Sequence, residues 1–133
     1  MELRIITPER VMSHEEADLV EAPGTSGEFG VLPGHVAFLS TLEHGEVRFT
    51  RGGKTRFIAT SGGFAEVRDD KVLLLLHTAE FAEEIDLARA QRAKERAETV
   101  LSGLSFEEEG YGELAAALLR ALTRISTASR AST

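Results

Sequence analysis

Four histidines are the side chains of this 133-residue chain best suited to hold a metal ion. His14, His35, His44 and His77 form no H-x-H or H-x-x-x-H pair, the spacings that bring two imidazoles to one ion. Local Ser-His-Asp patterns are lacking as well. Because the chain has no cysteine, a thiolate nucleophile, a zinc–thiolate site and a disulfide framework are excluded. We therefore expect neither a metal site nor catalysis by this chain alone.

The segment from Gly27 to His35, GEFGVLPGH, combines three glycines with a Pro-Gly pair. Pro33-Gly34 fits the central positions of a type II turn, since proline sets the first φ and glycine accepts the positive second φ. The simplest interpretation is a hairpin corner. The functional interpretation is a contact loop whose tip presents Glu28 and His35.

The segment Ile85–Ala90, IDLARA, precedes a helical pattern. Asp86 is suited to cap that helix, and Arg89 lies one turn further on, so a cap or an ion pair explains both residues. In the alternative, Asp86 accepts from an adenine amino group or a ribose hydroxyl. Arg89, Arg120 and Arg124 then meet the phosphates, from two helices folded side by side.

Arg120, Arg124 and Arg130 make residues 118–133 basic, with a charge of +3 and no acidic residue. A solvated helix face is the simple explanation. The alternative is an arm that swings onto an acidic partner surface.

The elements that would position these residues change near residue 84. Residues 1–84 hold 8 basic and 15 acidic side chains and nine of the 12 glycines, whereas residues 85–133 hold seven of each charge. The chain is therefore predicted to form an all-β domain over residues 1–84 and a helical domain over 85–133.

Eight short β-branched or aromatic runs predict the strands of the first domain. They are Leu3–Ile5, Ala17–Val20, Phe29–Leu32, Val36–Leu39, Val47–Phe49, Arg56–Ala59, Phe64–Val67 and Val72–Leu76. Gly52-Gly53 and Asp69-Asp70 are predicted hairpin turns. Many short strands without intervening helices indicate a β-sandwich or barrel.

The second domain has a period of about 3.6 residues, which predicts two amphipathic helices. We expect the first to end at Ser102-Gly103 with a left-handed glycine, and the second to begin at a capping box over Ser105–Glu108. The apolar faces are Ala90, Ala93, Ala97, Val100 and Leu104, and Leu114, Leu118, Ala121 or Leu122, Ile125 and Ala128. These alanine-lined faces predict an antiparallel hairpin of modest packing energy that can detach, with a frayed tail from Ser126.

The overall composition restricts the partners. With a net charge of -7 and no dense basic stripe, nucleic-acid binding is not expected. The longest apolar run, Val72–Leu76, is far shorter than the roughly 20 residues that cross a bilayer, and the N-terminus lacks an apolar signal core. We expect membrane association only through a partner, in a reducing compartment.

Several stretches, in their order and spacing, resemble one known family. They are Ile6-Thr7-Pro8, Gly27 to His35, Thr60 to Val67, Ala79-Glu80, and Ile85-Asp86 through Arg89-Ala90 to Ala97-Glu98. Followed by an alanine-rich hairpin, they are similar to the epsilon subunit of bacterial F-type ATP synthases, equivalent to the mitochondrial delta subunit. The resemblance covers nearly the whole chain. It implies a β-sandwich of about ten strands and a C-terminal α-helical hairpin, in a non-catalytic part of the rotor.

The resemblance also implies partners and a location. The sandwich would bind the gamma subunit and sit on the c-ring, with Glu28 and His35 facing the ring. It would couple proton-driven rotation to the catalytic alpha/beta hexamer. The protein would be peripheral, at the cytoplasmic face of the bacterial membrane.

For the hairpin, the resemblance implies inhibition of ATP hydrolysis, with Arg120, Arg124 and Arg130 near an acidic loop of the catalytic beta subunits. It also implies ATP as a regulatory ligand, with no cofactor required, through an I-D-x-x-R-A motif. The candidate ATP-binding residues are Glu80, Ile85, Asp86, Arg89, Ala90, Arg120 and Arg124. The acidic and glycine-containing run from Glu107 to Gly112 departs from ATP-binding relatives.

Two other classes of function remain open on the sequence. One is a small β-sandwich or cupin-like metalloenzyme that uses two or three of the histidines. The other is a free-standing ATP sensor whose hairpin acts on an unrelated partner.

Overall fold

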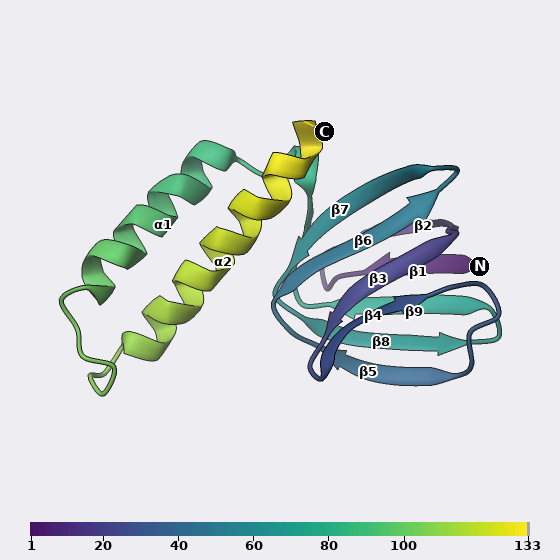
Figure 1. Ribbon diagram of the computed structural model, residues 1–133, viewed down its shortest axis with the longest axis horizontal. Coiled ribbons are helices and arrows are strands. Elements are labelled where there is room, and N and C mark those ends of the chain that lie inside the picture. Colours follow the sequence, from purple (N-terminus) through teal and green to yellow (C-terminus); the bar gives the residue numbers. More distant parts are fainter. Residues whose placement is uncertain (133) are drawn as a thin grey trace. The chain divides into compact units, whose positions relative to one another are not determined.

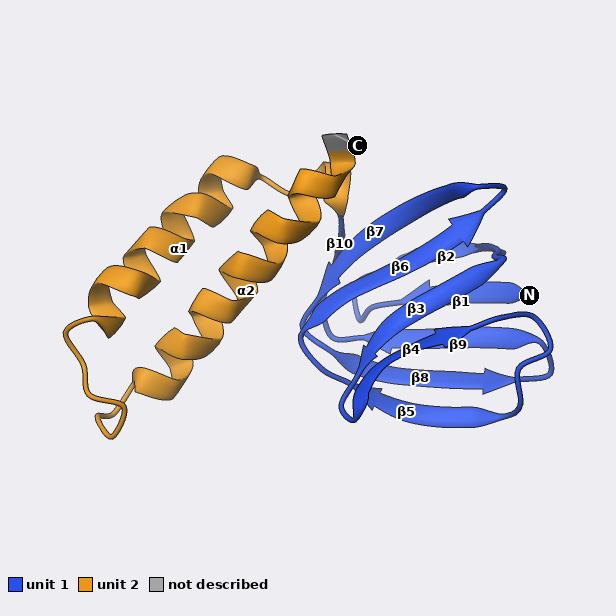
Figure 2. Ribbon diagram, in the orientation of Figure 1, with its two compact units in different colours: residues 1–81 blue, residues 82–133 orange. Residues whose placement is uncertain are grey.

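The structure is a computed structural model that describes residues 1–132, so Thr133, the last residue of the predicted helical domain, lies outside the described residues. Its contacts divide the chain into two compact units, residues 1–81 and 82–133 (Figure 2). The sequence places the division between residues 84 and 85, a few residues further along the chain.

Within residues 1–81, ten strands form one continuous sheet that folds over on itself (Figure 1). The strands are β1 Glu2–Ile6, β2 Val11–Glu16, β3 Leu19–Gly24, β4 Gly27–Val31, β5 Phe38–Leu42, β6 Gly45–Arg51, β7 Lys54–Thr60, β8 Gly63–Arg68, β9 Lys71–Leu76 and β10 Ala79–Phe81. Their order is β10-β7-β6-β3-β5-β8-β9-β1-β2, with β4 paired to β3, and β1 with β9 is the parallel pair. The predicted β-sandwich is confirmed.

The core of this unit comes from alternate residues of the strands. Successive side chains of a strand point to opposite faces, so β8 buries Ala65 and Val67 and turns Phe64 and Glu66 outward. The largest fully buried side chains include Phe49, Leu3, Ile5, Ile58 and Leu74, from four different strands. Burial of each such side chain contributes roughly 1.5–3 kcal/mol, which makes this shared core the main source of stability.

Both predicted hairpin turns are confirmed. Gly52 and Gly53 join β6 to β7 with φ of 57° and 79°, and Asp69 and Asp70 join β8 to β9 with φ of 51° and 60°. Two consecutive positive φ angles match the right-handed twist of the flanking strands, and Asp is among the few non-glycine residues that adopt them. The first turn is also held from outside, because the Gly52 N–H donates to the Asp18 carboxylate at 2.8 Å.

Two strands lie outside the eight that the sequence predicts. Strand β2, VMSHEE, is largely polar because it is at one end of the sheet order and buries only Ser13. Strand β10 has three residues, too few for a period to show. Strand β3 also starts at Leu19 instead of Ala17. The presence of β2 and β10 and the first residue of β3 are therefore determined by pairing with a neighbouring strand and not by the hydrophobic pattern of the segment.

The second unit contains a short 3₁₀ helix η1 Ala82–Glu84, helices α1 Leu87–Leu101 and α2 Tyr111–Ser129, and a terminal 3₁₀ turn η2 Arg130–Ser132. Helices α1 and α2 pack side by side in opposite directions, as predicted (Figure 1). Ala90 and Ala97 of α1 and Ala121 of α2 are buried. Small side chains at these positions let the two helices approach closely.

The helix ends differ from the prediction. Helix α1 does stop before Ser102, but Gly103 does not adopt a positive φ; its N–H donates to the Val100 carbonyl in a tightened last turn. The predicted capping box forms in part, since the Ser105 N–H donates to the Glu108 carboxylate at 3.3 Å. It closes an isolated turn, however, and α2 starts at Tyr111, after Gly110 with φ of 87°.

Two further expectations for the hairpin need correction, those for Val100 and for the tail, and one open alternative is settled in favour of Ala121. Val100 is exposed because the buried face of α1 continues from Ala97 to half-buried Leu101, four residues further on, and not to Val100. Ala121, and not Leu122, occupies the buried position of α2, and fully buried Thr127 joins it near the end of the helix. The tail expected to fray from Ser126 continues α2 and η2 through residue 132.

Gly63→Ala is expected to destabilise the first unit by about 2–4 kcal/mol. Gly63 has a φ of 151°, and an added Cβ would lie 1.9 Å from the Leu75 carbonyl oxygen, so the β8–β9 pairing would have to open. Differential scanning calorimetry measures the loss, since the chain has no Trp and one Tyr. Gly112→Ala is the control: nothing lies within 4 Å of its added Cβ, and it should stabilise α2 by about 0.5–1 kcal/mol. Equal unfolding temperatures for both variants would contradict this account.

Candidate functional site

The connection between β4 and β5 contains a tightly held turn. Gly34 has a φ of 83°, and the His35 N–H donates to the Leu32 carbonyl at 3.1 Å, which confirms the predicted type II turn. The Gly34 N–H also donates to the Asp70 carboxylate at 3.0 Å. The turn between β8 and β9 therefore fixes the position of the Pro33-Gly34 turn, 36 residues away in the chain.

His35 lies at the last position of this turn. Its Nδ1 lies 2.7 Å from the Val36 carbonyl oxygen, and its ring packs edge-on against Phe38 with 6.0 Å between the ring centres. Phe38 in turn contacts Phe29 edge-on at 5.0 Å. The imidazole is therefore oriented by its neighbours while remaining partly accessible to solvent.

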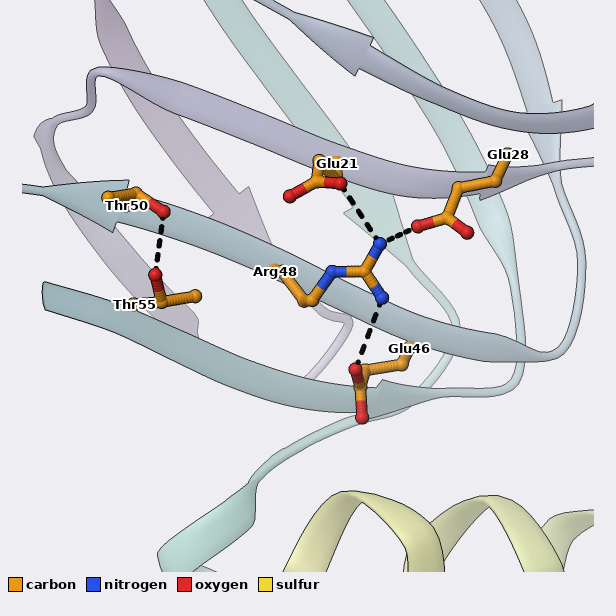
Figure 3. Close-up of polar contacts among 6 residues, drawn as sticks. All are labelled: Glu21, Glu28, Glu46, Arg48, Thr50 and Thr55. Carbon is orange, nitrogen blue, oxygen red and sulfur yellow. Dashed lines mark hydrogen bonds and ion pairs between the residues drawn. The ribbon is translucent and has the colours of Figure 1, made fainter. Parts of the chain in front are cut away.

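Glu28 is not at the loop tip, where the sequence analysis expected it beside His35. It lies within β4, opposite Pro23 of β3, because the β3–β4 hairpin turns earlier, before Gly27. Its side chain is 51% exposed and pairs with Arg48 of β6 (Figure 3). The two predicted contact residues thus belong to different parts of this surface, one to a strand and one to a turn.

Sequence reasoning missed the other charged residues that converge on Arg48. The guanidinium donates to the Glu21 carboxylate at 3.1 Å and to the Glu46 carboxylate at 3.3 Å, in addition to its pair with Glu28 (Figure 3). Glu46 and Arg48 share a strand face, a spacing of two that the sequence does show. Glu21 and Glu28 reach the same point only through strand pairing.

Exposed apolar side chains surround the Pro33-Gly34 turn and were also missed. Leu32 precedes the turn, Val36 follows it in the connection to β5, and Leu39 lies in β5; they are 60%, 75% and 70% exposed. Several exposed apolar side chains within eight residues are typical of a surface that contacts another molecule.

An apolar groove of about 270 Å³ lies elsewhere on the first unit. Its lining residues are Ile6, Thr7, Pro8, Phe64, Leu75, Leu76 and His77. His77 is the titratable side chain among them, and a catalytic pocket would instead bring several polar groups together. Across residues 1–132, no three His, Asp or Glu side chains cluster in a way that could hold a metal ion.

Glu2 and His14 form a cross-strand pair between β1 and β2. The two side chains are 2.9 Å apart, and the hydrogen bond from His14 holds the pKa of the Glu2 carboxyl below its usual value. The shift favours the ionised carboxylate, and both side chains are at the surface, so this pair supports the edge strand and does not form a proton-transfer site.

In the second unit, the Ile85–Ala90 motif has clear structural roles. The Asp86 carboxylate accepts from the Arg89 N–H at 3.0 Å, which confirms the predicted N-cap of α1. Ile85 and Ala90 are buried, and Ala90 has no exposed surface. The Arg89 side chain is exposed, so within the motif it is the cationic group available to a ligand.

The remaining candidate ATP-binding residues are only partly brought together. Helix α1 begins at the end of the hairpin where α2 finishes (Figure 1). Arg124 is half-buried in the second half of α2, while Arg120, one turn earlier, and Arg130, beyond the helix, are exposed. Glu80 belongs to β10 in the first unit.

Two family models match this chain in succession. The ATP synthase delta/epsilon chain β-sandwich domain matches residues 1–82, and the long α-helix domain of the same chain matches residues 83–129. The chain belongs to the ATP synthase delta/epsilon family. As an epsilon subunit of the F-type enzyme, it is a non-catalytic part of the complex, and the catalytic subunits are separate.

Bacterial relatives of the delta/epsilon family are similar over almost their full length. The ATP synthase epsilon chain of Nitratidesulfovibrio vulgaris is 47% identical over 125 residues, covering 94% of this chain and 92% of the relative. That of Geobacter metallireducens is 45% identical over 130 residues, covering 98% and 94%. That of Desulfitobacterium hafniense is 48% identical over 126 residues, covering 95% and 94%.

Solved structures of the delta/epsilon fold come from rotor assemblies. A chain of the Euglena gracilis mitochondrial ATP synthase, in a structure of OSCP, F1 and c-ring, superposes with a TM-score of 0.77 at 27% identity, covering 98% of this chain and 79% of that one. A chain of the Tetrahymena thermophila central stalk and c-ring shares the fold, with a TM-score of 0.57 at 14% identity. The helices described within residues 1–132 are too short or too polar to cross a bilayer.

Ala97→Leu is expected to destabilise the helical unit by about 1–3 kcal/mol, because a larger side chain at a buried alanine separates α1 from α2. Hydrogen exchange of the α2 amides measures the loosening. Ala88→Leu, at an exposed position of the same helix, should leave exchange within error of the unchanged chain. Equal exchange in the two variants would show that the alanine contact does not hold the hairpin closed.

Proposed function

We propose that this epsilon subunit couples proton translocation through the c-ring to ATP synthesis, with its β-sandwich bound to the gamma subunit and resting on the ring. The exposed apolar side chains Leu32, Val36 and Leu39 around the pinned turn are the observation that carries the proposal. They give the turn a surface suited to a partner, and the solved relative from Euglena gracilis comes from an assembly that includes a c-ring.

Glu28 and His35 supply the polar part of the c-ring contact in this proposal. Both side chains reach solvent, Glu28 from the strand β4 and His35 from the turn that follows it. The subunit then works at the cytoplasmic face of the bacterial membrane and is attached to the membrane through the complex.

The helical hairpin is proposed to inhibit ATP hydrolysis by extending toward the alpha/beta hexamer. Its packing supports this role, because the buried side chains between α1 and α2 are small and each contributes less apolar burial than a leucine would. Arg120, Arg124 and Arg130 then lie against an acidic surface of the catalytic subunits.

Truncation after Glu84 tests the division of roles. ATP synthase assembled with the shortened subunit should keep proton-coupled ATP synthesis and gamma binding, and its ATP hydrolysis should rise several-fold. The full-length variant with Arg120, Arg124 and Arg130 replaced by Gln is the matched control for the hairpin's charge, and should show the same rise. Loss of synthesis on truncation would contradict the assignment of coupling to the sandwich, and failure of the full chain to copurify with gamma would favour a free-standing sensor.

ATP is proposed to act as a regulatory ligand that holds the hairpin closed. Asp86 and the exposed Arg89 lie together at the start of α1, and Arg124 lies on the half of α2 that runs beside it. Phosphates placed there meet cationic side chains from two helices, so bound ATP joins them. Arg120, one turn before Arg124 on α2, is the supporting contact in this proposal, and Ile85 and Ala90 shape the helix start.

Calorimetric titration of ATP into the purified chain tests this ligand. Saturable binding is expected for the unchanged chain, with at least a tenfold loss of affinity for Arg89→Ala. Arg92→Ala removes an exposed arginine from the next turn of α1, outside the motif, and should bind as the unchanged chain does. If no saturable heat is detected at several millimolar ATP, then ATP is not the regulatory ligand of the hairpin. The proposed coupling role of the sandwich would be unaffected.

A further inference from the structure

Arg48 reaches across the sheet from β6 to the Glu28 carboxylate on β4. Strand β3 lies between the two, with Glu21 directly opposite Arg48 on one side and opposite Gly30 of β4 on the other. Because residue 30 is a glycine, strand β4 presents no side chain beside Glu21 at this point. The carboxylate proposed to face the c-ring is therefore held by a residue two strands away.

Exposure is graded through this charge cluster. The side chain of Glu46 is 12% exposed and that of Arg48 22%, followed by Glu21 at 34% and Glu28 at 51%. Glu28 is thus the outermost carboxylate of the cluster, and it pairs with the Arg48 guanidinium (Figure 3). The inner carboxylates, Glu46 and Glu21, set the position of the Arg48 guanidinium. The guanidinium in turn sets the position of the Glu28 carboxylate.

The Arg48 guanidinium is shared by three carboxylates. It pairs with Glu21, Glu28 and Glu46 from three different strands. Without Arg48 the three carboxylates would repel one another, and Glu28, the most exposed, would turn into water. A planar guanidinium can donate to several carboxylates in set directions, whereas a lysine ammonium carries the same charge without that fork.

We propose that Arg48 is a positioning residue that sets the direction of the Glu28 carboxylate and so prepares it for the c-ring contact. The inference rests on the proposed function, in which Glu28 faces the ring. Arg48 itself stays beneath the contact, anchored by Glu46 and Glu21, and acts through Glu28.

The affinity of the gamma–epsilon pair for detergent-solubilised c-ring tests the inference by a double-mutant cycle. Glu28→Gln should weaken binding about tenfold, and Arg48→Gln about three- to tenfold. In the Glu28→Gln background, Arg48→Gln should add less than a twofold change, because the group it positions has gone. Arg48→Lys should weaken binding as much as Arg48→Gln, since the fork and not the charge is what positions Glu28.

Two controls separate positioning from folding. Arg56→Gln removes one arginine from the adjacent strand β7, where its guanidinium lies 3.8 Å from the ring centre of Phe81, and should bind the c-ring within twofold of the unchanged pair. Arg48→Gln itself should unfold in a single cooperative calorimetric transition and should bind gamma within twofold of the unchanged chain. Weakened gamma binding by Arg48→Gln would show that Arg48 acts on the fold of the sandwich, which overturns the positioning role.

The outcomes distinguish the inference from the function on which it rests. If Glu28→Gln leaves c-ring affinity unchanged, the proposed contact of Glu28 is wrong. If Glu28→Gln weakens binding but Arg48→Gln does not, or if the two losses multiply, Arg48 does not act through Glu28 and the inference is overturned. Full binding by Arg48→Lys would show that the charge alone suffices, which also overturns a positioning role.

Discussion

The alternation of side chains along the strands is the constraint on which the first unit depends. Successive side chains of a strand point to opposite faces, so Phe49 and Leu74 join the shared core while the residues beside them in the chain face outward. The outward positions are then available for charge, as at Glu46 and Arg48, or for exposed apolar groups, as at Leu39. The strand register that places side chains in the core therefore also places the side chains of the surface proposed to contact the c-ring.

Two kinds of local rigidity support that surface. The Pro33-Gly34 turn is held by its own hydrogen bond and by the Asp70 carboxylate from a distant hairpin, which fixes where His35 lies. Glu28 is held instead by a guanidinium that reaches it across strand β3. In the proposed contact with the c-ring, groups that are fixed before the partner arrives lose less conformational entropy on binding.

The helical unit follows a different physical rule. The fully buried side chains of α1 and α2 are small, Ala90, Ala97 and Ala121 with Thr127, so each contributes less apolar burial than a leucine would. Its starting end is well defined by the Asp86 cap, whereas its far end contains Gly110 and Gly112 and an isolated turn. A capped start of α1 and a glycine-containing far end suit a hairpin that opens between α1 and α2, which is what the proposed inhibition requires.

The amino-acid sequence alone predicts the change from a β region to a helical region within a few residues, the presence of eight strands though not all of their bounds, both two-residue hairpin turns, the type II turn at Pro33-Gly34 and the Asp86 cap. These features are local, because proline, paired glycines or aspartates and a capping carboxylate act within a few residues. The three-dimensional structure adds that β2 and β10 join the sheet and that Glu28 meets Arg48 and not His35. Those outcomes depend on which strands pair and in which register, and groups that lie far apart in the chain meet only once that pairing is set.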